Sequence, residues 1–204
     1  MRTLRPLLLV LCGATLAACG NSAKTVTVKG KTLTVLEAAY GTSGSPSSSA
    51  GLTPFCQPLA AGQFEVIITD FVMCEQTKQK PTPVDNRTLF HSTESASLRM
   101  IFPSALKKNS DGSFMTNTFQ VGSQTTSFCR NQSGGTAAAF FAHNSAGQSS
   151  FDVNEEANGG SISVTSYTMG AAMQGTFDLT FGSDHVTGSF DALYCSGLTA
   201  AYGT

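Results

Sequence analysis

The chain contains no tryptophan, only three histidines and few charged residues, which make up 12% of its 204 residues. Its 12 Lys and Arg nearly balance its 13 Asp and Glu, so the formal net charge is −1. A protein that binds nucleic acid or an anionic membrane surface through charge carries a clear basic excess. The balance therefore argues against both of these partners.

Sequence motifs for catalysis or metal binding are also lacking. No C-x-x-C pair, H-E-x-x-H helix or G-x-S-x-G elbow is present. His91, His143 and His185 stand apart from one another and from the cysteines, so we interpret them as surface histidines in loops and expect neither a zinc site nor any cofactor. We predict no catalytic residue, although a site assembled from residues distant in sequence stays open.

Residues 1–18 have the pattern of a cleaved signal. Arg2 and Arg5 form a positive start, an apolar run begins at residues 7–11, and the small Ala17 and Ala18 come last. A membrane-spanning helix needs about 20 apolar residues, which is more than this run offers. The pattern therefore predicts export and removal of residues 1–18.

Leu16-Ala17-Ala18-Cys19 resembles the lipobox of bacterial lipoproteins. The resemblance implies cleavage before Cys19, a lipid on its thiol and an acylated new amino terminus. Two or three acyl chains anchor a protein stably. Gly20 follows Cys19 where well-studied enterobacterial lipoproteins retained in the inner membrane have aspartate, which favours the outer membrane. The other interpretation is an ordinary secretory signal in which Cys19 has no role.

The remaining cysteines predict disulfides. Cys12 leaves with the signal and Cys19 takes the lipid, so four cysteines stay available: Cys56, Cys74, Cys129 and Cys195. In an oxidising envelope we expect two disulfides, for which three connectivities are possible. We favour Cys56–Cys74 and Cys129–Cys195, because these pairs join loop or strand ends that are close in sequence or close the domain.

The segment after Cys19 has two interpretations. Residues 25–28 and 32–36 alternate β-branched residues around Lys29-Gly30-Lys31, which predicts a hairpin, and residues 41–51 are a Ser/Gly-rich low-complexity stretch. Either residues 20–54 form a tether, or the hairpin belongs to the domain and 41–51 is a surface loop. We divide the chain into a signal at 1–18, an anchor segment with the strand or hairpin and the flexible stretch at 19–54, and a β domain at 55–204.

Further strands are predicted from β-branched and aromatic runs that end at turn residues. The runs are 64–73, 97–102, 114–121 and 161–166. Residues 137–142 fit a strand or a helical turn, and 75–87 fit a loop. Helix is expected at most as a short segment near Ser104–Lys108.

The last third of the chain contains a repeated G-[TS]-F-D phrase, at 175–178 and 188–191. Pairing Phe181 with Val186 around the turn at 182–185 predicts a hairpin and, with 161–166, an antiparallel meander. Its apolar face carries Phe177, Leu179, Phe181, Val186 and Phe190. Its polar face carries Asp178, Thr180, Thr187, Ser189 and Asp191, so we interpret both aspartates as solvated.

This ending, with Cys195, resembles uncharacterised bacterial lipoproteins that close on a similar G-x-F-D hairpin and cysteine. The resemblance covers the lipobox and about the last 35 residues. It implies a β architecture and no activity.

Residues 152–160 contain a weak calcium candidate. Asp152, Asn154 and Glu156 place oxygen ligands at alternate positions, as calcium loops do. The segment departs from the EF-hand pattern at the turn glycine and at the distal glutamate. We therefore favour a solvated acidic loop.

These patterns predict an all-β domain, an antiparallel sandwich or barrel with a C-terminal meander and two disulfides. The function we expect is that of a lipid-anchored envelope protein, held to the membrane through Cys19. Its β domain would be a non-catalytic binding or structural module whose partner is another envelope protein or a wall component. The alternatives are a secreted hydrolase with a site built from distant residues and a lipocalin-like carrier of an apolar ligand.

Overall fold

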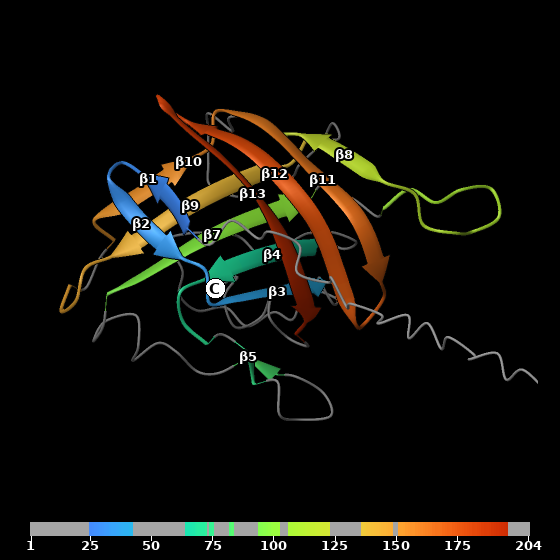
Figure 1. Ribbon diagram of the computed structural model, residues 1–204, viewed down its shortest axis with the longest axis horizontal. Helices are drawn as coiled ribbons and strands as arrows, with labels where there is room; N and C mark the ends of the chain where they lie inside the picture. The colour runs from blue at the N-terminus through green and yellow to red at the C-terminus, as the bar shows by residue number, and fades with distance from the viewer. Residues whose placement is uncertain are drawn as a thin grey trace, which may run out of the picture.

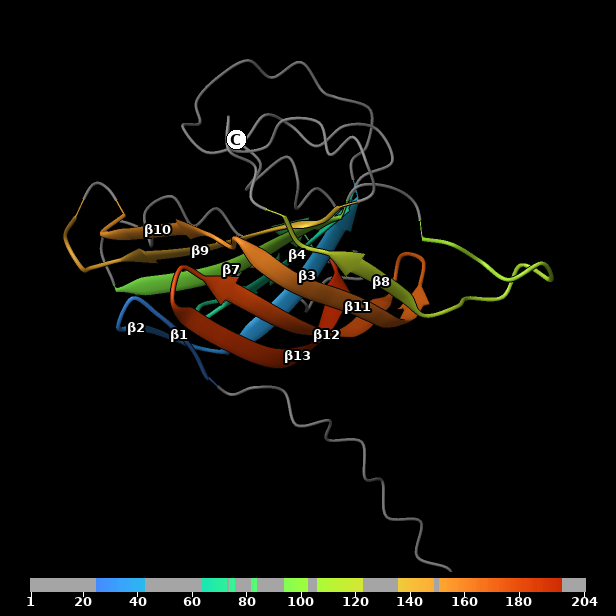
Figure 2. The same ribbon diagram turned by 90° about the horizontal axis from the view of Figure 1, so that it is seen from above.

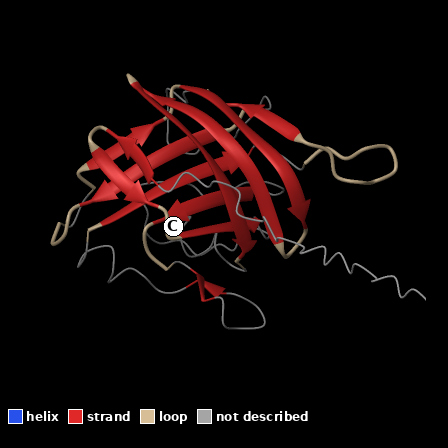
Figure 3. Cartoon of the chain, in the orientation of Figure 1, coloured by secondary structure: helices blue, strands red, loops and turns tan. Residues whose placement is uncertain are grey.

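The computed structural model contains strands as its only regular elements in the part of the chain that it describes (Figure 3). The described residues are 25–42, 64–72, 74–75, 82–83, 94–102, 106–122, 136–148 and 151–195. The prediction of an all-β fold is confirmed. Residues 137–142, for which strand and helical turn were both considered, lie in strand.

Nine strands form one sheet in the order β10-β9-β7-β4-β3-β13-β12-β11-β8 (Figure 1). All its neighbouring pairs are antiparallel except β13 and β3, which run parallel. Two short pairs, β1 with β2 and β5 with β6, lie outside this sheet. The described strands are β1 (Thr25–Val28), β2 (Lys31–Thr34), β3 (Glu37–Thr42), β4 (Phe64–Thr69), β5 (Cys74–Glu75), β6 (Thr82–Pro83), β7 (Ser95–Phe102), β8 (Asn117–Gln120), β9 (Ala138–Asn144), β10 (Val153–Glu156), β11 (Gly159–Thr168), β12 (Ala172–Phe181) and β13 (Asp184–Tyr194).

The sheet curls into a half-barrel with two facing layers (Figure 2). One layer contains β4, β7, β9 and β10, and the other contains β11, β12 and β13. The curl passes through the short link between β10 and β11. There Ala157 N donates to Ala139 O of β9 at 2.9 Å and Asn158 N donates to Thr180 O of β12 at 2.8 Å. One bent stretch of chain thus joins the two layers.

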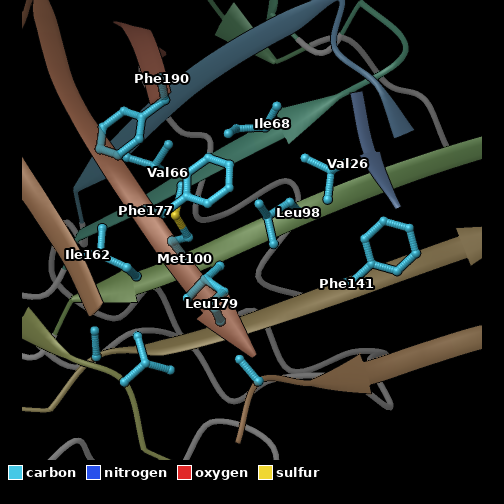
Figure 4. Close-up of a cluster of buried hydrophobic side chains, with 14 of the residues drawn as sticks. Val26, Val66, Ile68, Leu98, Met100, Phe141, Ile162, Phe177, Leu179 and Phe190 are labelled. Atoms are coloured by element: carbon cyan, nitrogen blue, oxygen red, sulfur yellow. The ribbon is translucent and has the colours of Figure 1, made fainter. Parts of the chain in front are cut away.

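Apolar side chains from both layers fill the space between them (Figure 4). Every residue of β4 is buried, in keeping with the prediction of an interior strand there. Val66, Leu98 and Met100 from one layer belong to the same core as Phe177 and Leu179 from the other. Burial of apolar surface at about 25 cal/mol per Å² makes this core the main favourable contribution to the stability of the fold.

The C-terminal meander is present, but the predicted pairing was wrong by two residues. Phe181 pairs with Asp184, and Leu179 pairs with Val186. Side chains alternate with a period of two along a strand, so a slip of two residues leaves every side chain on its predicted face. The predicted apolar residues are accordingly all buried: Phe177, Leu179, Phe181, Val186 and Phe190.

The N-terminal hairpin belongs to the folded body, which agrees with the second of our two interpretations. Lys29 and Gly30 form its turn with φ angles of 52° and 74°, both in the left-handed region that two-residue hairpin turns use. Val26, Val28 and Leu33 point into the main core. The next strand, β3, was not predicted, and it lies between β13 and β4 in the large sheet. The boundary between residues 54 and 55 therefore does not mark where the fold begins.

The predicted disulfide pairing was wrong. Cys74 is bonded to Cys195, across 121 positions of sequence. The bond ties β5 to the residue that follows β13, and Cys195 N donates to Tyr40 O of β3 at 2.9 Å. The sheet brings the end of β13 beside β3 and β4, so the fold brings Cys74 and Cys195 together although they are far apart in sequence. Cys19, Cys56 and Cys129 lie outside the described residues.

Candidate functional site

A group of charged and polar side chains lies where β9 ends and where β7 and β10 begin. The antiparallel register places His143, near the end of β9, opposite Ala96 and Val153. Glu94 and Asp152 precede those two strands, so both reach the same end of the sheet. Lys31 reaches it from the N-terminal hairpin. We call the set His143, Asp152, Glu94, Ser145 and Lys31 the histidine–carboxylate cluster.

His143 is held between two carboxylates. Its side chain is 2% exposed, with Nδ1 at 2.6 Å from Asp152 Oδ1 and Nε2 at 2.9 Å from Glu94 Oε1. Both ring nitrogens of His143 thus face carboxylate oxygens. The histidine therefore joins the two carboxylates at the centre of the cluster.

Asp152 has hydrogen-bond donors on both of its oxygens. Besides His143, Ser145 Oγ donates to Asp152 Oδ2 at 2.7 Å and Lys31 Nζ lies 2.9 Å from the same oxygen. Burial favours the protonated acid, but the hydrogen bonds from His143, Lys31 and Ser145 outweigh it and hold the pKa of Asp152 well below its usual range. The same hydrogen bond raises the pKa of Lys31. Both groups are therefore charged near neutral pH.

The cluster connects elements and does not resemble a catalytic triad. In a triad the serine gives its proton to the histidine, which the acid orients. Here Ser145 donates to Asp152, and both nitrogens of His143 face carboxylates. Through Lys31 the cluster instead links β2 to the ends of β7, β9 and β10. A second link to the same hairpin is the 2.7 Å hydrogen bond from Lys29 N to Asp184 Oδ2.

The interpretation of His143 as a surface residue was wrong, because it is buried in β9. His185 is exposed as expected, with its Nε2 at 2.7 Å from Asp178 Oδ1 and exposed fractions of 61% and 58% for the two side chains. Asp191 is exposed on the same strand pair. His91 lies outside the described residues. The sequence offered no signal for the cluster, since Glu94, His143 and Lys31 meet only through strand pairing.

The segment of the calcium candidate lies largely in a strand. Among the described residues, no group of three or more His, Cys, Asp or Glu side chains is arranged to hold a metal ion. Residues 153–156 are strand β10 and not the predicted loop. Successive residues of an extended strand point to opposite faces and alternate ones lie about 6.6 Å apart, so Asn154 and Glu156 cannot wrap around one ion with Asp152.

A buried ion pair lies on the outer side of β4 and β7. Arg99 Nε donates to Glu65 Oε2, and the Glu65 side chain is fully buried. Cross-strand pairing places the pair beside Ile101 and Phe140, which are also buried. Within the described residues, Glu65 Oε1 and Arg99 Nη2 have no hydrogen-bond partner. Removing one member of such a pair leaves a buried charge uncompensated, so each depends on the other.

The outer side of the meander carries rows of small polar side chains. One row crosses four strands and consists of Thr118, Ser163, Thr176 and Ser189. The next row consists of Gln120, Ser161, Asp178 and Thr187. Thr118 Oγ1 and Ser163 Oγ are hydrogen-bonded at 2.8 Å. We call these two rows the meander face, which agrees with the polar face predicted for β12 and β13.

No protein-family model, curated protein or solved structure matches the chain. None of the residues described here forms a helix that is long and apolar enough to cross a membrane. Functional inference therefore depends on the chemistry of the chain itself.

Proposed function

We propose that this chain is a lipid-anchored cell-envelope protein whose β domain is a non-catalytic binding or structural module. The lipid is carried by Cys19, and the outer membrane is the proposed destination. The partner is another envelope protein or a wall component. No resident cofactor is needed for this role.

The observation that carries the proposal is the filled interior of the half-barrel. Side chains from β4, β7, β9, β11, β12 and β13 meet in one core, to which the N-terminal hairpin adds Val26, Val28 and Leu33. A carrier of an apolar ligand needs that space for its ligand. The outer surface is thus the part of the molecule best suited to recognition.

The geometry of the histidines supports the same choice. His143 is paired with Asp152 and Glu94, and His185 is paired with Asp178. A hydrolase built on a histidine base needs a ring nitrogen within reach of a nucleophile. Among the described residues no hydrogen bond joins His143 or His185 to a hydroxyl or thiol, so the hydrolase alternative gains no support from them.

Lipid anchoring is tested by Cys19→Ser with membrane fractionation and metabolic labelling with a radioactive fatty acid. The protein with Cys19 should fractionate with membranes and carry label, whereas the serine variant should lose both. Unchanged labelling and membrane association of the variant would overturn the anchor.

Binding through the outer surface is tested by photo-crosslinking in intact cells. A photo-reactive residue replaces Thr176 at the centre of the meander face, Asp111 in the exposed turn at 109–113 or Met169 in the turn between β11 and β12. A specific partner should give a discrete adduct at one position and not at the others. Equal background at all three positions would contradict a binding role.

A further inference from the structure

The described chain enters the fold at Thr25, six positions after the proposed lipid-bearing Cys19. Six extended residues span at most about 20 Å. Thr25 pairs with Thr34, which is two residues before Leu36. If Cys19 carries a lipid, the base of the N-terminal hairpin is held within about 20 Å of the headgroups.

This end of the molecule carries two of the large apolar side chains that are exposed in the described residues. Leu36 is 63% exposed and Val72 is 53% exposed. Leu36 N donates to Thr69 O at 2.8 Å, which places the start of β3 beside the end of β4, three residues before Val72. Exposed apolar side chains that lie beside a membrane tether are suited to the lipid interface.

The outward face of the hairpin is uncharged. Thr25 is opposite Thr34, Thr27 is opposite Thr32, and all four side chains are exposed. We call these four threonines together with Leu36 and Val72 the hairpin base. These four threonines place no charged group on this face of the hairpin.

Two acidic side chains near the hairpin base, Glu37 and Asp70, turn toward the protein. Glu37 Oε1 accepts a hydrogen bond from Cys74 N at 3.1 Å, and Asp70 Oδ1 accepts one from Ala96 N at 2.9 Å. At the turn of the hairpin, Lys29 is exposed. The charges near this surface are mixed: Glu94, 68% exposed, precedes β7 at the same end of the sheet, and Asp184 lies against Lys29 at the hairpin turn.

We propose that the hairpin base is a membrane-contact surface, with Leu36 and Val72 inserted among the lipid headgroups. This proposal rests on the proposed lipid anchor and extends it by assigning the side of the domain that faces the bilayer. Tyr40 Oη donates to Thr168 O, which places the turn that carries Met169 near Tyr40, four positions along the chain from Leu36. Four strand positions correspond to about 13 Å. Met169, although 78% exposed, should therefore stay in water.

The absence of tryptophan makes a direct test possible. Leu36→Trp and Met169→Trp each introduce a single fluorophore at an exposed position. The full-length lipidated variants are reconstituted into phosphatidylcholine vesicles with or without bromine-labelled acyl chains, which quench tryptophan at short range. We expect Trp fluorescence at position 36 to be quenched several-fold more than at position 169 and to shift to the blue.

Two further variants test the chemistry of the contact in the Leu36→Trp background. Val72→Asp should reduce the quenching, because a carboxylate resists transfer to the interface. Leu193→Asp is the matched control: Leu193 is 45% exposed and pairs with Ala39, about 10 Å along β3 from Leu36, so quenching should stay the same.

Vesicle flotation separates the possible failures. Protein that does not float would overturn the lipid anchor, and the membrane-contact surface with it. Protein that floats with equal quenching at positions 36 and 169, or with no effect of Val72→Asp, would overturn the contact surface and leave the anchor in place.

Discussion

At the scale of single residues, the partners of the buried polar side chains could not be predicted from the local sequence. His143 lies between Asp152 and Glu94, and Glu65 lies against Arg99. In sequence His143 looked isolated, because its partners precede two other strands. Conversely, the exposure of Asp178 and Asp191 was predicted correctly, since it follows from the alternation of side chains along a strand.

Asp152 is expected to make the stability of the fold depend on acid pH. Its folded pKa lies below the unfolded value of about 3.9, so on acidification the unfolded chain takes up the proton first. The contribution of Asp152 is therefore complete above about pH 5 and is lost as the pH falls toward the folded pKa. Lys31 and His143 lie against Asp152, and Glu94 contacts the other ring nitrogen of His143. Asp152→Asn should remove about 2 kcal/mol at pH 7 and flatten the profile between about pH 5 and 3.

Thermal melting of both proteins across this pH range measures the effect. Ser145→Ala, which removes one neutral donor to Asp152, is the milder control and should cost about 1 kcal/mol without flattening the profile. A variant Asp152→Asn with the acid sensitivity of the parent would show that other carboxylates govern it.

Gly175 is expected to tolerate no side chain. A Cβ atom there would lie 2.3 Å from Ser163 O and 2.4 Å from Phe190 Cζ, whereas one at Gly159 would have nothing within 4 Å. Gly175→Ala should lower the free energy of unfolding by about 1–3 kcal/mol because the Phe190 ring must shift. Gly159→Ala should change it by less than about 0.5 kcal/mol. Urea denaturation compares them, and equal effects would contradict the tight contact.

At the scale of elements, periodicity predicted which residues form strands and which side faces the core. It predicted the partners within the N-terminal hairpin and the meander, but not the register of β12 with β13 or the pairing of strands that are distant in sequence. The pairing of β12 with β13 was wrong by two residues because a slip of two preserves both faces. β3 was missed because Glu37–Thr42 has two alanines and a glycine and little of the β-branched pattern. It is held in place by β13 and β4 on its two sides.

The Cys74–Cys195 bond should stabilise the arrangement of these strands. It closes a loop of 121 positions, for which the chain-entropy model gives about 4–5 kcal/mol. The double variant Cys74→Ala, Cys195→Ala should lower the free energy of unfolding by up to this amount, as measured by urea denaturation.

Non-reducing peptide mapping tests the connectivity. In the parent protein it should recover the Cys74 and Cys195 peptides linked to each other. Of the three connectivities possible for the four cysteines, this pairing leaves the one in which Cys56 is joined to Cys129. A linked Cys56–Cys74 peptide would contradict the structure.

At the scale of the whole molecule, residues 25–42, the first that the structure describes, complete a sheet and a core that are otherwise formed by the rest of the chain. β3 joins β13 to β4, and the hairpin contributes Val26, Val28 and Leu33 to the core. The histidine–carboxylate cluster then ties that hairpin to the sheet through Lys31. A folded body without residues 25–42 would have an open sheet at its centre and an exposed core.

A fragment that starts at residue 55 should therefore fail to fold, whereas one that starts at residue 20 should fold. Circular dichroism and cooperative thermal unfolding distinguish the two. The longer fragment should show strand-type spectra and one transition, and the shorter one should show neither. A cooperative transition in the fragment 55–204 would contradict the central role of β3.

The sequence by itself determined the class of the fold, the core face of the meander and the presence of the N-terminal hairpin. These follow from local periodicity and turn chemistry, which act over a few neighbouring residues. Only the tertiary structure decided the curl of the sheet, the parallel pairing of β3 with β13, the Cys74–Cys195 bond and the surroundings of His143. Those features depend on which distant strands become neighbours, and that choice minimises the exposed apolar surface of the entire chain rather than of any one segment.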